Sequence, residues 1–314
     1  MIIAVIIGVL LGVLVVCSLL MAYYAYRVTF YAAPRKGDED AYLIPTEEQY
    51  QKDKDKLRQC IVNLDQMEFQ PVTIRSFDGR KLFGRYYHTK DGAPVQIQFH
   101  GYRGSALRDL CGGTPLALKM GHNVLLVDQR SHGRSDGKTI TFGVLERRDC
   151  AEWVKYVQKQ FGEDTPIVLT GVSMGAATVL MAAELDLPDA VKAVVADCPY
   201  SDPRKIIEKV AGTMGLPGKP AVIFCTLGGA IFGGFRLGSA SALGAVKKSK
   251  VPILLIHGED DRFVPCDMSR EIFACCGEGK QLETFPNAAH AMCYMEDPVR
   301  YETVVTGFLQ KYVS

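Results

Sequence analysis

The chain has no marked excess of charge of either sign, and it lacks the motifs of several common protein classes. Its 314 residues include 36 Lys and Arg against 35 Asp and Glu, a formal net charge of +1. Without a basic excess, no polyanion such as nucleic acid is implied as a partner. There is no Cys-x-x-Cys pair at metal spacing, no glycine-rich phosphate loop after a strand and no internal repeat. We therefore expect neither a metal nor an organic cofactor.

Charged side chains are also absent from Ile2 to Tyr26. At about 1.5 Å per residue, a helix of that length exceeds the roughly 30 Å hydrocarbon core of a bilayer. We predict a transmembrane anchor over residues 1–27. A cleaved signal peptide is the alternative, but signal peptides have a basic start and a shorter apolar stretch, and this segment has neither. Lipidation at Cys17 stays a minor alternative, because Val16 is bulky where a small residue is expected.

The basic residues near this segment bear on which side of the membrane the rest of the chain lies. Arg27, Arg35 and Lys36 follow the segment and nothing basic precedes it. The positive-inside rule then favours the cytoplasmic face. The ten cysteines show no disulfide framework spacing, which favours the same side.

Beyond the anchor, residues 28–70 are largely polar and predict a juxtamembrane linker and helix, and residues 71–314 predict one large domain. Asp78-Gly79 predicts a hairpin between two antiparallel strands. Short apolar runs then alternate with helical stretches, which predicts an α/β fold with a mostly parallel sheet covered by helices on both faces. The predicted strands are Val72–Arg75, Leu82–Tyr87, Val95–Phe99, Val124–Val127, Ile167–Thr170, Ala193–Ala196, Ile253–Ile256 and Leu282–Phe285.

The most informative motif is the pentapeptide Gly171-Val172-Ser173-Met174-Gly175, between an apolar run and a helical stretch. A tight strand-to-helix turn holds a serine in a strained conformation with its hydroxyl exposed, and it leaves no room for side chains on either flank. Glycine at both ends meets that demand. Ser173 is therefore the candidate nucleophile, with a structural turn as the competing interpretation.

A serine nucleophile needs a histidine and an acid, which in hydrolases with this turn come later in the chain, acid first. His290 follows the last predicted strand, and Asp261 lies in the loop after the strand before it. Asp197 ends an earlier strand candidate and stays open as an alternative acid. His290 would take the serine proton and Asp261 would orient the imidazole.

Four motifs in one order resemble the α/β-hydrolase superfamily, in particular a bacterial branch of membrane-anchored serine hydrolases and esterases. They are His100-Gly101, the turn at 128–135, the serine pentapeptide and the acid loop at 258–265. The resemblance implies an α/β-hydrolase fold, Asp261 as the acid, and an oxyanion hole formed by the backbone N–H groups of Tyr102 and Met174. It assigns no catalytic role to His132. Similar membrane-anchored hydrolases are often exported, so the side of the membrane stays open.

The interval before the strand at 253–256 is longer than a crossover needs, and in this fold it is where lids are inserted. We predict a lid at 200–248, whose segment 221–235 is apolar and rich in glycine. It is either an apolar cap over Ser173 or a buried helix pair at the sheet edge. Trp153 falls on the apolar face of a predicted helix and is expected to be a core residue.

These observations predict a membrane-anchored serine hydrolase that cleaves a carboxylic ester or related acyl bond through an acyl-enzyme. The expected partners are a small-molecule ester or acyl substrate and the membrane. A thioesterase and a serine peptidase of the same fold share the motifs and stay open. A non-catalytic binding protein is the remaining alternative, although no triad member is missing. The oligomeric state and the substrate's acyl length are not readable from the sequence.

Overall fold

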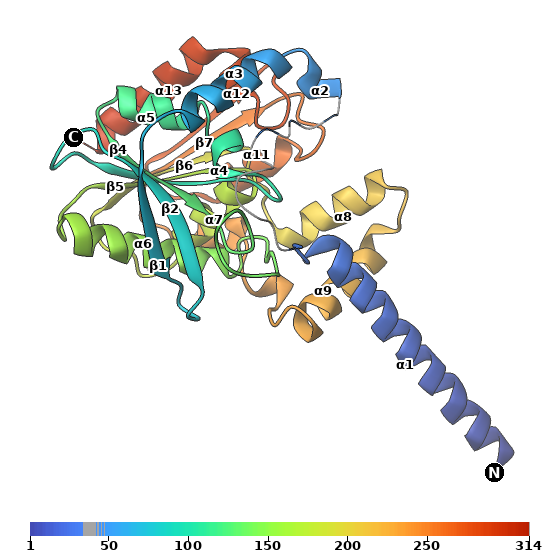
Figure 1. Cartoon of the computed structure of the whole chain (residues 1–314). Coiled ribbons are helices and arrows are strands. Elements are labelled where there is room, and N and C mark those ends of the chain that lie inside the picture. Colours follow the sequence, from blue (N-terminus) through green and yellow to red (C-terminus); the bar gives the residue numbers. More distant parts are fainter. Residues whose placement is uncertain (34–41, 43, 45, 47, 314) are drawn as a thin grey trace.

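A computed structural model of the chain describes residues 1–33, 42, 44, 46 and 48–313, and it contains one eight-stranded sheet (Figure 1). The strand order is β1-β2-β4-β3-β5-β6-β7-β8. The strands are β1 (Gln70–Arg75), β2 (Lys81–Tyr87), β3 (Val95–Phe99), β4 (Asn123–Asp128), β5 (Ile167–Val172), β6 (Val191–Asp197), β7 (Ile253–Gly258) and β8 (Lys280–Phe285).

The sheet is antiparallel at one edge and parallel elsewhere. β1 pairs with β2 and β2 with β4 in antiparallel register, whereas every pairing from β4 through β3 to β8 is parallel. The turn between β1 and β2 places Gly79 at φ +84°, a conformation that glycine adopts without strain. The mostly parallel sheet, the hairpin and all eight predicted strands are confirmed. Strands β3 to β7 are almost entirely buried because helices cover both faces.

Helices α6, α7, α10 and α11 pack on one face of the sheet, and α3, α4, α5, α12 and α13 pack on the other (Figure 1). The first group is α6 (Glu146–Phe161), α7 (Met174–Ala182), α10 (Ala242–Ala245) and α11 (Asp267–Cys275). The second group is α3 (Lys54–Asp65), α4 (Ala106–Asp109), α5 (Gly113–Lys119), α12 (Cys293–Glu296) and α13 (Pro298–Tyr312), preceded by the short α2 (Glu48–Gln51). Trp153 of α6 is buried in the core, as the sequence predicts.

Part of the predicted linker at 28–70 is packed onto the sheet domain. Leu57, Ile61 and Leu64 recur at helical spacing on one side of α3 and are all buried. They share an apolar cluster with Leu107 of α4 and Leu126 of β4. The helix therefore covers the sheet, with only its other side in solvent.

The long interval between β6 and β7 forms α8 (Pro203–Thr213), α9 (Gly218–Ile231) and a 3₁₀ turn at Leu237–Ser239. The Asp202 side chain caps α8 by accepting the N–H of Arg204 at 2.7 Å, and Pro203 begins the helix where no N–H is needed. Helix α9 packs along the end of α1 that joins the domain, and α8 packs against α9 (Figure 1). Within the predicted insertion at 200–248, α8 and α9 therefore form a helix pair beside α1, whereas α10 packs on the sheet domain.

Helix α1 (Ile2–Thr29) projects from the domain, with its N-terminus far from the sheet (Figure 1). Among the described residues it is the one helix long and apolar enough to cross a membrane, with a mean hydropathy of 3.2 in its most apolar window. Its last turns are buried at Ala22 and Tyr26, and Phe30 just beyond them packs edge-on against Phe142 and Phe235. The junction is therefore part of the folded core.

The residues invoked for membrane orientation are only partly described. Arg27 lies in the last turn of α1, with its guanidinium 3.8 Å from the centre of the Tyr31 ring. Arg35 and Lys36 lie outside the described residues. All ten cysteines are unpaired.

Candidate active site

Ser173 occupies the sharp turn between β5 and α7. Its backbone has φ 56° and ψ −114°, a strained conformation for a residue with a side chain. A Cβ built on Gly171 would lie 2.3 Å from the carbonyl carbon of Gly175, and one on Gly175 would lie 2.1 Å from the carbonyl oxygen of Phe99. Gly171 is therefore required by the tightness of the turn itself, and Gly175 by its close packing against the end of β3.

His290, which the sequence places far from Ser173, lies directly beside it. The loop after β8 carries His290, and its Nε2 lies 2.9 Å from the Oγ of Ser173. Its Nδ1 lies 2.6 Å from Oδ2 of Asp261, in the loop after β7. All three side chains are buried. Serine, imidazole and carboxylate therefore form one continuous hydrogen-bonded chain.

The surroundings of Asp261 favour its ionised form. Its Oδ1 accepts the backbone N–H groups of Phe263 at 2.9 Å and Val264 at 2.8 Å. Burial opposes ionisation, but the charge of His290 and the hydrogen bonds from His257 and His290 outweigh it and hold the pKa of Asp261 below its ordinary range. A charged carboxylate at this position would stabilise an imidazolium on His290.

Asp197, the alternative acid, is in a different environment. Its Oδ2 accepts the hydroxyl of Tyr301 at 3.0 Å, and its Oδ1 has no partner within the part of the chain that the structure describes. Complete burial raises the pKa of this carboxyl to about 6, despite the hydrogen bond from Tyr301. Asp261 is therefore the acid that contacts His290, and Asp197 does not.

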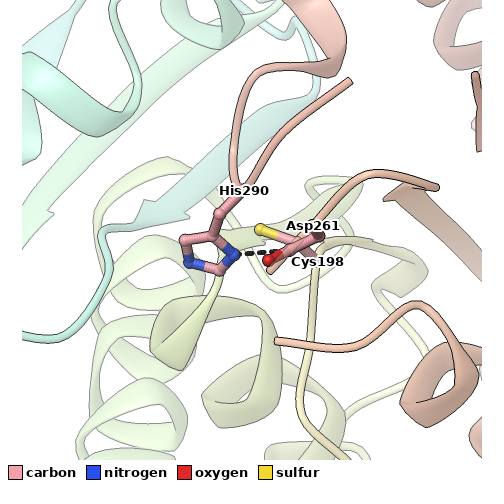
Figure 2. Close-up of side chains that lie close together, drawn as sticks. All are labelled: Cys198, Asp261 and His290. Atoms are coloured by element: carbon pink, nitrogen blue, oxygen red, sulfur yellow. Dashed lines mark hydrogen bonds and ion pairs between the residues drawn. The ribbon is translucent and has the colours of Figure 1, made fainter. Parts of the chain in front are cut away.

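Cys198 lies close to the His290–Asp261 pair, and the three side chains approach one another closely enough to hold a metal ion (Figure 2). Figure 2 shows the Cys198 sulfur beside the Asp261 carboxylate, with the dashed bond joining Asp261 to His290. Burial, followed by the nearby charge of Asp197, raises the pKa of the Cys198 thiol well above its ordinary value. Metals bind the thiolate and not the thiol. A protonated Cys198 is therefore a poor metal ligand, and the three residues fit the hydrogen-bonded Asp261–His290 pair better than a metal site.

Two residues next to Ser173 have backbone N–H groups that are available to bind a substrate oxygen. The loop after β3 contacts the serine, since a Cβ on Gly101 would lie 3.3 Å from the Cβ of Ser173. Tyr102 in this loop and Met174 at the start of α7 have N–H groups with no acceptor among the described residues. The first N–H groups of a helix have no partner within it. These are the donors predicted for an oxyanion hole.

This loop is held in place by Asp109, which the sequence did not single out, and by His132, to which the sequence gave no catalytic role. Asp109 accepts the N–H of Gly101 at 2.8 Å, and the Nε2 of His132 accepts the N–H of Arg103 at 3.1 Å. The two bonds flank Tyr102 on both sides. No local signal marks Asp109, whereas His132 belongs to the turn motif at 128–135 and could have been assigned a positioning role.

Two cavities, each of about 520 Å³, meet at Ser173. One, the more polar of the two and named the polar cavity, is lined by His290 together with charged residues that include Arg108 and Asp109. The other is apolar and extends between α1, α8 and α9. The volumes are typical of small-molecule sites, which range over roughly 300–1,000 Å³. A substrate with unlike halves would find a separate space for each half beside one hydroxyl.

Comparison with known families identifies two parts of the chain. A family profile described as alpha/beta hydrolase fold matches residues 97–216, and a profile described as Serine aminopeptidase, S33 matches residues 230–297. The first match contains the serine turn and the loop after β3. The second contains the acid and histidine loops.

Whole-chain comparisons agree with these matches. The uncharacterized protein YqkD of Bacillus subtilis is 28% identical over 276 residues, which cover 88% of each chain. Protein bem46 of Schizosaccharomyces pombe is 23% identical and covers 77% of each chain. A solved Pyrococcus furiosus esterase superposes with a TM-score of 0.64 at 25% identity, covering 81% of this chain and 96% of that one. Est1E of Butyrivibrio proteoclasticus, solved with ferulic acid, has a TM-score of 0.59 at 24% identity, with 77% and 99% covered.

Proposed function

Since this chain belongs to the α/β-hydrolase superfamily, we propose that it is a membrane-anchored serine hydrolase that cleaves carboxylic esters through an acyl-enzyme. Ser173 is the nucleophile, His290 the general base and acid, and Asp261 the residue that orients and stabilises the imidazole. The backbone N–H groups of Tyr102 and Met174 form the oxyanion hole. Helix α1 anchors the domain to a membrane.

The reaction follows from these positions. His290 removes the proton of Ser173 through Nε2 as the Oγ attacks the ester carbonyl, and the two N–H donors bind the resulting oxyanion. The tetrahedral intermediate then collapses, the C–O bond to the alcohol breaks, and His290 gives its proton to the departing alcohol. A water molecule next attacks the acyl-enzyme, again losing its proton to His290. The second intermediate collapses, the bond between the acyl carbon and Oγ breaks, and His290 returns its proton to Oγ, which releases the carboxylic acid and regenerates Ser173.

The observation that carries the proposal is the continuous chain of contacts from Ser173 Oγ through His290 to Asp261, at 2.9 Å and 2.6 Å. A structural turn has no need of a buried imidazole aimed at its hydroxyl. The strained backbone of Ser173 adds independent support, since such strain is concentrated at functional sites. A binding protein that merely kept the fold would have no reason to retain either feature.

Peptide hydrolysis is a second candidate, because the profile that matches residues 230–297 is described as a serine aminopeptidase. Such an enzyme must bind the ammonium group of its substrate, usually with free carboxylates. Of the carboxylates lining the polar cavity, Asp109 is paired with Arg108 at 2.7 Å. The other, Asp197, is buried and accepts the hydroxyl of Tyr301 at 3.0 Å. The apolar cavity instead favours an acyl chain. Ester hydrolysis is therefore the better supported reaction, and thioesters remain chemically close to it.

The test uses the full chain in detergent and a fluorophosphonate probe, which labels activated serines covalently. We expect labelling of the wild type, none of Ser173→Ala, and normal labelling of Ser201→Ala, a buried serine bonded to Glu271. p-Nitrophenyl esters, the matching thioesters and aminoacyl anilides are assayed in parallel. Folded wild-type protein that takes up no label would favour the binding-protein alternative, and turnover of anilides alone would favour the peptidase.

A further inference from the structure

The apolar cavity beside Ser173 has an unusual wall, because part of it is the membrane helix. Met21, Ala25 and Val28 of α1 line the cavity together with residues of α8 and α9. Ser173 lines the same cavity. The helix that would anchor the protein therefore also bounds the space next to the candidate nucleophile.

Helix α1 is held closely against this wall. A Cβ built on Gly228 of α9 would lie 2.4 Å from the carbonyl oxygen of Ala22, so the two backbones touch where glycine leaves room. Thr29 contacts Cys225 through Oγ1 and Sγ at 3.5 Å. The hydroxyl of Tyr102 donates to the carbonyl of Thr29 at 2.7 Å. These contacts hold α1 against α9 and against the loop beside Ser173.

The cavity opens at the surface between α1 and the turn that joins α8 to α9. Four apolar or aromatic side chains line the cavity and are also largely exposed: Met21 (49%), Tyr24 (65%), Met214 (64%) and Leu216 (52%). A contiguous apolar opening of this kind is costly in water. The apolar side chains of α1 that precede Met21 are exposed as well, and α9 exposes Ile223 and Ile231.

In a bilayer, the apolar opening of the cavity would contact hydrocarbon and not water, which removes the unfavourable exposure. With α1 in a membrane, Tyr23 and Tyr24 lie near the end where the helix enters the domain, and tyrosine favours the boundary between hydrocarbon and water. The mouth of the cavity would then face the outer part of the hydrocarbon layer. An acyl chain could move from the bilayer into the cavity without crossing water.

We propose that the apolar cavity is the acyl site and that its substrate is a long-chain ester dissolved in the membrane, whose hydrocarbon chain enters along α1. The proposal rests on the function proposed above. The ester carbonyl then reaches Ser173, while the alcohol half occupies the polar cavity that His290 lines. The membrane helix is on this view a wall of the active site as well as an anchor.

The first experiment locates the bound chain. The full-length protein in phosphatidylcholine nanodiscs is treated with a fluorophosphonate carrying a palmitoyl-length chain and a terminal diazirine, then illuminated and digested. We expect crosslinks in peptides containing 21–29 or 203–231. Crosslinks confined to the polar cavity, at Tyr50 or Tyr294, would overturn the proposal while leaving the hydrolase function intact. Absence of serine labelling would instead overturn both.

The second experiment fills the cavity from two sides. Ala25→Trp in α1 and Ala221→Trp in α9 place an indole in the space, and Leu20→Trp adds the same group on the exposed side of α1. For the first two variants, the ratio of kcat/KM for palmitoyl over acetyl p-nitrophenyl ester should fall at least about tenfold. For Leu20→Trp the ratio should not change. A ratio that is unchanged in both cavity variants contradicts the proposal.

The third experiment tests the route. A fluorogenic oleoyl ester is placed either in the nanodiscs that hold the protein or in separate vesicles of the same lipid. Entry along α1 predicts faster hydrolysis when ester and protein share a bilayer. Equal rates at equal total ester would mean that the chain arrives through water, which overturns the lateral route.

Discussion

The hydroxyl of Tyr102 donates a 2.7 Å hydrogen bond to the backbone carbonyl of Thr29, the last residue of α1. The backbone N–H of the same tyrosine is one of the two that we propose as donors of the oxyanion hole. Arg103, its neighbour, bonds the carbonyl of Val28 at 2.8 Å. The loop beside the candidate nucleophile is therefore held from one side by the sheet domain and from the other by α1.

Removing this hydroxyl tests whether α1 helps to position the loop. Tyr102→Phe keeps the backbone N–H and the ring, so only the bond to Thr29 is lost. We expect kcat for a short ester to fall about threefold to tenfold, since a loosened oxyanion donor loses part of the roughly 3 kcal/mol such a donor supplies. KM should change little. Steady-state kinetics in detergent check this, and a fall in kcat/KM carried by KM alone would contradict it.

The two candidate acids can be separated by matched amide substitutions. Asp261→Asn removes the charge that faces His290 and favours the wrong tautomer, so kcat should fall about ten-thousandfold. Asp197→Asn leaves the His290 contact intact, and activity should stay within about tenfold of the wild type. Ester hydrolysis at neutral pH gives both values. If instead Asp197→Asn were the inactive variant, the acid would have been misassigned.

The residues of the candidate site differ in how well they can be predicted from the local sequence. The serine turn is readable because Gly171 and Gly175 flank Ser173 and no other residue fits there. His290 is readable because loops after parallel strands meet at one sheet edge. The acid loop at 258–265 favoured Asp261 through its resemblance to the family motif, but Asp197 also follows a strand, and only atomic positions show which carboxylate reaches the imidazole.

The fold was predictable to a similar extent. All eight strands follow from apolar runs and turn residues, because a buried parallel sheet demands that composition. The role of α1 in lining the apolar cavity was not predictable, because it depends on where the C-terminal end of α1 packs against α9. The clue in the sequence was Gly228 within an apolar helix, but a glycine alone does not say which partner approaches it.

The raised pKa of Asp197 also leads to a prediction of how the free energy of unfolding depends on pH. In the folded chain burial raises its pKa to about 6, against 3.8 as the ordinary value. Its contribution to stability is therefore fully present below about pH 4 and is lost as the pH rises towards about 6, where a buried charge must form. Asp197→Asn does not ionise. Its advantage over the wild type should grow from about pH 4 to pH 6 and reach about 3 kcal/mol.

Thermal unfolding of both proteins in the same detergent, at intervals across that pH range, measures the difference. The Tyr301 hydroxyl can still donate to the amide oxygen of the variant, so the comparison isolates the charge. A stability difference that does not vary with pH would mean that Asp197 ionises normally in the folded state.

The contact between α1 and α9 can be tested at the glycine that permits it. A methyl group at Gly228 would lie 2.4 Å from the carbonyl of Ala22 and 3.1 Å from the Cβ of Tyr26, so the helices must separate. Gly228→Ala should destabilise the folded chain by about 1–3 kcal/mol, the usual cost of overpacking. Gly212 of α8 is the matched control, because a Cβ there meets nothing within 4 Å. Gly212→Ala should be neutral or stabilising by up to about 1 kcal/mol.

The same pair of variants separates anchoring from substrate binding. If α1 is only a tether, moving it slightly from α9 changes stability but not the preference among esters. If α1 is a wall of the acyl site, Gly228→Ala should also lower the palmitoyl-to-acetyl ratio of kcat/KM, because the cavity loses its fit to a chain, while Gly212→Ala leaves that ratio unchanged. Equal ratios in the two variants, together with the expected loss of stability in Gly228→Ala, would reduce α1 to a tether.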